Sequence, residues 1–177
     1  TLVLDASTAP PEGIVFEAAG GAADPADRLV LQWSGGAGPT SVQHVLGADQ
    51  GTVAADWNAS EATMATSVHV VYAGVEFIDD GWQAEARSFE LADGVSGRLT
   101  GGIVAGASGL ETSSSGQVDF ADPSRSLTVV AAGLPASDAS PDAARLEVLG
   151  TIAIRGGDVR LDAGERGYLN VSATVTT

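Results

Sequence analysis

Residues 66–91 read TSVHVVYAGVEFIDDGWQAEARSFEL, and in this stretch apolar and polar residues alternate with a period of two. That period is typical of β-strands with one buried face. Asp80 and Gly81 lie between two such runs, and both residue types tolerate the positive φ of a tight type I′ turn. The stretch therefore predicts a β-hairpin, and Gly156 with Gly157 predicts a second one between residues 151–155 and 158–161.

The same alternation recurs through most of the chain, interrupted by evenly spaced glycine- and proline-containing breaks. It predicts an all-β fold in a single domain, residues 1–177, built as a β-sandwich of jelly-roll or Greek-key type. One short helix is expected near residues 58–66, where Asn58 and Glu61 form a capping box. The expected strands are 1–5, 13–18, 27–33, 41–46, 66–78, 81–91, 96–106, 117–120, 126–132, 145–150, 151–155, 158–161 and 168–175.

The charge composition argues against nucleic acid as a partner. The chain carries 23 acidic residues against 8 basic ones, all arginine, for a formal net charge of -15. Such a field repels nucleic acid, which requires a basic patch. Without lysine and with this acid excess, the composition resembles that of proteins from salt-loving organisms, although a GC-rich genome also explains it. No run of 18 apolar residues is present, so we expect no membrane span.

Candidate catalytic residues are sparse. His44 and His69 lie mid-strand with no nearby carboxylate to orient them, and we interpret both as residues of a polar strand face. Gln83, Glu85 and Arg87 are expected to form another polar face. Although Glu76, Glu85 and Glu90 invite comparison with the paired carboxylates of glycosidases, the sequence favours no enzyme and no organic cofactor.

Acidic turns suggest a calcium site, because hard cations prefer oxygen ligands in loops. No cluster has EF-hand spacing. The candidate ligands are Asp79 with Asp80, Asp119 with Asp122, and Asp158 with Asp162 and Glu165.

The chain has two asparagines, Asn58 and Asn170, and each begins an Asn-x-Ser glycan acceptor pattern. Asn58, in a predicted loop, is the better acceptor. Asn170 lies in a predicted strand, where its amide is less accessible.

These observations favour a non-enzymatic structural subunit that assembles with copies of itself, and possibly with related subunits. We expect it outside the cell, in a virion coat or decoration layer or in a cell-surface filament. Residues 1–8 and the C-terminal strand are candidates for edge pairing or strand exchange. The alternative hypothesis is a secreted carbohydrate-binding module in which Trp33, Trp57 or Trp82 serves as the sugar platform.

Overall fold

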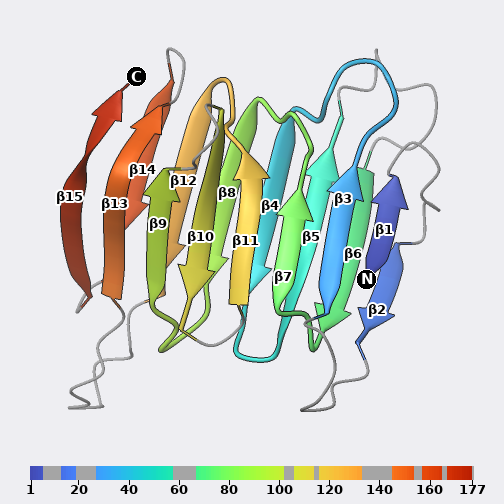
Figure 1. Ribbon diagram of the computed structural model, residues 1–177, viewed down its shortest axis with the longest axis horizontal. Coiled ribbons are helices and arrows are strands. Elements are labelled where there is room, and N and C mark those ends of the chain that lie inside the picture. Colours follow the sequence, from blue (N-terminus) through green and yellow to red (C-terminus); the bar gives the residue numbers. More distant parts are fainter. Residues whose placement is uncertain are drawn as a thin grey trace.

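The computed structural model confirms the all-β sandwich (Figure 1). The described part of the chain contains strands and no helix, and so no helix that could cross a membrane. The predicted helix at 58–66 lies outside the described residues. The structure describes residues 1–5, 13–18, 27–57, 67–101, 106–113, 116–132, 145–153, 157–164 and 167–176.

Among the described residues, fifteen strands form two facing sheets, one of eight strands and one of seven. The eight-stranded sheet has the order β1 (Leu2–Asp5), β3 (Arg28–Gln32), β7 (Phe77–Asp80), β11 (Gly116–Ala121), β10 (Ala107–Thr112), β9 (Gly97–Gly101), β13 (Arg145–Ala153) and β15 (Tyr168–Thr176). The seven-stranded sheet has the order β14 (Asp158–Asp162), β12 (Ser126–Ala131), β8 (Ala86–Leu91), β4 (Ser41–Leu46), β5 (Gln50–Asp56), β6 (Ser67–Ala73) and β2 (Ile14–Glu17).

In the part of the chain that the structure describes, nine of the 13 strand pairs are parallel. The cause is the path of the chain, which repeatedly crosses from one sheet to the other. Strands β12, β13, β14 and β15 alternate between the sheets, so β12 and β14 are parallel neighbours and so are β13 and β15. Within the confirmed sandwich, this pairing departs from the antiparallel arrangement of jelly rolls and Greek keys.

Both predicted hairpins are wrong. Strands β7 and β8 flank Asp80 and Gly81 but belong to opposite sheets, and so do β13 and β14 on either side of Gly156 and Gly157. A type I′ turn also needs positive φ at both central residues, and neither Asp80 nor Gly81 has it. Residues 81–85 cross from one sheet to the other, and the chain also changes sheet between β13 and β14.

The alternation identified most strands, with three kinds of error. Residues 145–150 and 151–155 are expected as two strands, but Arg145–Ala153 form one continuous strand, β13. The stretch 66–78 was expected to be one strand, but it divides into β6 and β7 at Gly74, whose φ is +66°. Strands β5 and β10, the central strands of two antiparallel meanders, were missed. Each has few large apolar residues: Val53 is the largest core residue of β5, and Leu110 is that of β10.

Gly74 follows β6 with a positive φ, and its substitution tests whether this conformation is needed for stability. A Cβ at this position would lie 3.0 Å from the Ala18 carbonyl oxygen, on a backbone conformation that side chains disfavour. Gly74→Ala should therefore lower the free energy of unfolding by about 1–2 kcal/mol. Gly36→Ala is the matched control, because a Cβ there meets nothing within 4 Å. Denaturant unfolding of both variants checks this, and equal losses would contradict it.

Candidate functional site

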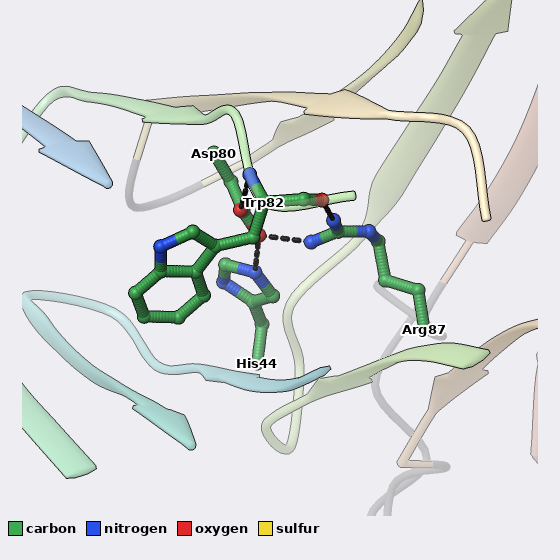
Figure 2. Close-up of polar contacts among 4 residues, drawn as sticks. All are labelled: His44, Asp80, Trp82 and Arg87. Carbon is green, nitrogen blue, oxygen red and sulfur yellow. Dashed lines mark hydrogen bonds and ion pairs between the residues drawn. The ribbon is translucent and has the colours of Figure 1, made fainter. Parts of the chain in front are cut away.

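The most unusual polar feature is a cluster of His44, Asp80 and Arg87 in the core (Figure 2). All three side chains are 0% exposed. Asp80 is the last residue of β7 in the eight-stranded sheet, whereas His44 on β4 and Arg87 on β8 belong to the opposite sheet. The cluster therefore joins the two layers at the point where the chain crosses between them.

Asp80 is the centre of this cluster. Its Oδ2 lies 2.8 Å from Nε2 of His44 and also accepts a hydrogen bond from Nη1 of Arg87. Its Oδ1 accepts the backbone N–H of Trp82 at 3.0 Å, which fixes the start of the crossing. Nη2 of Arg87 donates to the carbonyl oxygen of Trp82 at 2.6 Å. One carboxylate thus holds both a neighbouring backbone segment and two side chains of the other sheet.

Aromatic rings surround the charged groups. The His44 ring stacks on Phe89 with centroids 4.9 Å apart, and Phe89 packs against Phe120 at 4.8 Å. The guanidinium carbon of Arg87 lies 5.5 Å from the centroid of Phe120, a distance at which a cation is attracted to the ring face. These contacts exclude water from the charges.

Burial and pairing set the protonation states. Burial lowers the pKa of His44 below its ordinary value of 6.5, despite the opposing effect of Asp80. Burial would raise the pKa of Asp80, but the Arg87 guanidinium and the His44 hydrogen bond hold it below its ordinary value of 3.8. The cluster is therefore an Asp80–Arg87 ion pair with a neutral imidazole that donates its Nε2–H to the carboxylate.

This arrangement corrects two sequence expectations. The sequence predicts His44 on a polar face without a carboxylate partner, yet His44 is buried and bonded to Asp80, 36 positions away. The sequence predicts that Arg87 shares a polar face with Gln83 and Glu85, but only Arg87 lies in β8 and points into the core. His69 is exposed on β6, as expected for a polar strand face.

A histidine bonded to an aspartate also occurs in hydrolytic triads, so its access to substrate matters. Here no atom of the three side chains is open to solvent. Nδ1 of His44, the nitrogen left free for proton transfer, has no hydrogen-bond partner among the described residues. The geometry can join two sheets, but it offers no path for a substrate.

The candidate calcium ligands do not converge within the described part of the chain, where no three His, Cys, Asp or Glu side chains come together. Asp79 pairs with Arg28 at 3.2 Å, and Asp80 is occupied in the cluster. Asp158 and Asp162 lie at the two ends of β14, where Asp162 pairs with Arg160 at 3.2 Å. Glu165 lies outside the described residues.

The three tryptophans pack together beside the crossing. Trp33 and Trp57 have centroids 4.9 Å apart, and Trp57 meets Trp82 edge-on at 6.0 Å. Trp82 is 0% and Trp57 7% exposed, whereas Trp33 is half-buried. Of the two glycan acceptor candidates, Asn170 lies in a strand as predicted but is exposed there, contrary to the expected low accessibility, and Asn58 lies outside the described residues.

An open cleft of about 250 Å³ lies at the starts of β9 and β13. Its arginines are already paired: Arg98 with Glu111 at 3.5 Å and with Glu147 at 3.4 Å, and Arg145 with Glu147 at 3.1 Å. The cleft is smaller than typical ligand pockets, and its cations are balanced by its carboxylates.

Comparison with protein-family models, curated proteins and solved structures finds no match to the chain.

The cluster predicts that substitutions of two adjacent aspartates, Asp80 and Asp79, lower the free energy of unfolding by very different amounts. Asp80→Asn leaves the Arg87 guanidinium buried without a counter-charge and should lower the free energy of unfolding by about 3–5 kcal/mol. Asp79→Asn breaks only the half-exposed pair with Arg28 and should cost less than about 1 kcal/mol. Chemical denaturation of the two variants tests this, and similar losses would show that the cluster does not hold the sheets together.

A second prediction concerns acidification. The folded state keeps His44 neutral because burial lowers its pKa. Below about pH 6.5, His44 therefore binds a proton in the unfolded chain but not in the folded one. Stability should therefore decrease from pH 7.5 to pH 5.5, with a contribution from His44 of at most about 1.4 kcal/mol per pH unit. Asp80 adds a further loss below about pH 4, where the unfolded carboxyl becomes protonated first.

His44→Gln should remove the His44 part of this pH dependence, whereas His69→Gln on the exposed face of β6 should retain it. Denaturant unfolding at the two pH values in molar salt, which screens the surface charge, measures both slopes. Identical slopes in the wild-type protein and His44→Gln would refute the assignment.

Proposed function

We propose that this protein is a structural subunit that assembles with copies of itself, as part of a virion coat or decoration layer or of a cell-surface filament. The observation that carries the proposal is that edge strands of the two sheets are free to pair with another strand. Among the described residues, four strands have a ladder partner on one side only, and they lie at two opposite ends of the molecule: β1 and β2 at one end, β14 and β15 at the other (Figure 1). Natural monomers usually blunt such edges with charges, proline or short strands.

The edge strand β15 has none of these protections. It is nine residues long and contains no charged residue or proline, in a chain of net charge -15. Three of its large side chains are exposed: Tyr168 by 68%, Leu169 by 47% and Val171 by 46%. A long, uncharged and partly apolar edge is a surface on which another strand can pair.

The rest of the molecule supports a scaffold role. Its most unusual polar cluster is closed to solvent and binds one sheet to the other. The acidic surface keeps subunits apart and soluble until their charges are screened. The carbohydrate-binding alternative has less support, because Trp57 and Trp82 are buried and a sugar platform must be exposed.

Association should increase with salt, since each subunit repels its copies through 15 excess negative charges. Sedimentation velocity from about 0.05 to 2 M salt, followed by electron microscopy of the high-salt samples, should show a shift from monomers to ordered assemblies. Monomers at every salt concentration, with and without calcium, would reject the proposal.

A further inference from the structure

The two sheets do not end together at the β14–β15 end. The eight-stranded sheet extends one strand further, because β15 is added outside β13 while β14 is the last strand of the other sheet (Figure 1). Leu169 and Val171 are in register with Leu146 and Val148 of β13, so all four point toward the sandwich interior. Leu146 and Val148 are 0% exposed, whereas Leu169 and Val171 are 47% and 46% exposed. The inner face of β15 is therefore uncovered.

The position facing β15 lies beside β14, the edge of the seven-stranded sheet. Strand β14 pairs with β12 on one side and has no strand partner on the other among the described residues. A strand placed there would extend the ladder of β14 and cover the apolar inner face of β15 at the same time.

Strand directions limit what can fill this position. Only residues 154–157 separate β13 from β14, and they span less than about 20 Å, whereas a nine-residue strand is about 30 Å long. Strand β14 must therefore run back, antiparallel to β13 and to its parallel neighbour β15. Figure 1 shows β13 and β15 pointing the same way and β14 the opposite way.

We propose that a second copy of this chain fills the position through a two-fold axis that runs parallel to the strands, between the sheets. This rotation preserves strand direction and exchanges the two layers. The partner's β15 then lies antiparallel beside β14, and β15 lies antiparallel beside the partner's β14. Both layers become continuous across the contact, as an isologous interface requires.

At this interface the two β15 strands face each other across the axis. Leu169 meets the partner's Leu169, and Val171 meets the partner's Val171, because the rotation does not change height along the strand. No charge of β15 is brought into the contact. A face about 30 Å long and about 20 Å deep hides roughly 600 Å² per subunit, which reaches the lower end of stable interfaces.

Other arrangements of two copies leave a free strand edge unpaired or the apolar inner face of β15 uncovered. Addition of β15 to β1 of a translated copy forms a parallel ladder but leaves the inner face of β15 uncovered. A two-fold axis perpendicular to the sheets joins β15 to β15 edge to edge and leaves two such faces uncovered. Only the axis parallel to the strands pairs both free edges and covers both apolar faces.

The inference rests on the proposed function, and two double variants separate it from that proposal. Leu169→Asp with Val171→Asp places two charges on the inner face, and Asn170→Asp with Ser172→Asp places the same two charges on the outer face of the same strand. The first pair should weaken dimerisation at least about 100-fold in sedimentation equilibrium, and the second by less than about 5-fold. Thermal unfolding should show both variants folded, since all four positions are exposed in the subunit.

If the wild-type protein assembles and the two variants weaken assembly equally, this interface is wrong while the structural role stands. If the wild-type protein never assembles, both fail.

Symmetry is tested by Val171→Cys, since the chain has no cysteine of its own. Facing sheets lie about 10 Å apart, so a short bismaleimide should join the two thiols at high salt and give covalent dimers. Asn170→Cys points outward and should give far fewer. Equal yields from the two variants, or no dimers from Val171→Cys, would overturn the two-fold arrangement.

Discussion

A single buried carboxylate determines how the layers of this protein meet. Asp80 ends a strand of one sheet, accepts the backbone amide of Trp82 in the crossing, and binds His44 and Arg87 of the other sheet. A charge in this position is tolerated only because its counter-charge and hydrogen bonds are already in place. The surrounding apolar contacts are non-directional, whereas the bonds of Asp80 to His44 and Arg87 are directional contacts between the two sheets.

The crossing that Asp80 fixes is one example of a path that the whole chain follows. Because successive strands alternate between the sheets, neighbours within a sheet tend to run parallel, and the chain needs no helical crossover to connect them. The same alternation leaves a different number of strands in each sheet. Strand β15 therefore extends beyond the edge of the seven-stranded sheet. The order in which the chain visits the two sheets thus leaves an apolar surface exposed.

The alternation of buried and exposed positions along each strand marks the three residues of the buried cluster as core positions. His44 has the same parity as Val42 and Leu46, Arg87 the same as Phe89 and Leu91, and Asp80 the same as Ile78, and every one of these residues is buried. Each charged or polar residue thus occupied a core position of its own strand. The pairing itself was not readable, because Asp80 and His44 are 36 residues apart and belong to different sheets. Likewise, Asp80 and Gly81 fit a turn, but local turn chemistry does not reveal to which sheet the next strand returns.

The sequence by itself determined the all-β class, the sandwich and the positions of most strands, because a two-residue period and turn residues are local properties of the chain. It also determined the acidic surface, which depends on composition alone. Only the tertiary structure decided which strands became neighbours, which polar residues paired in the core, and which apolar strand was left uncovered. Those outcomes depend on contacts between segments far apart in the chain, and local patterns favour many such pairings equally. The exposed inner face of β15 is of this kind: its alternation predicts a buried face, and only the count of strands in the opposite sheet leaves Leu169 and Val171 without a cover.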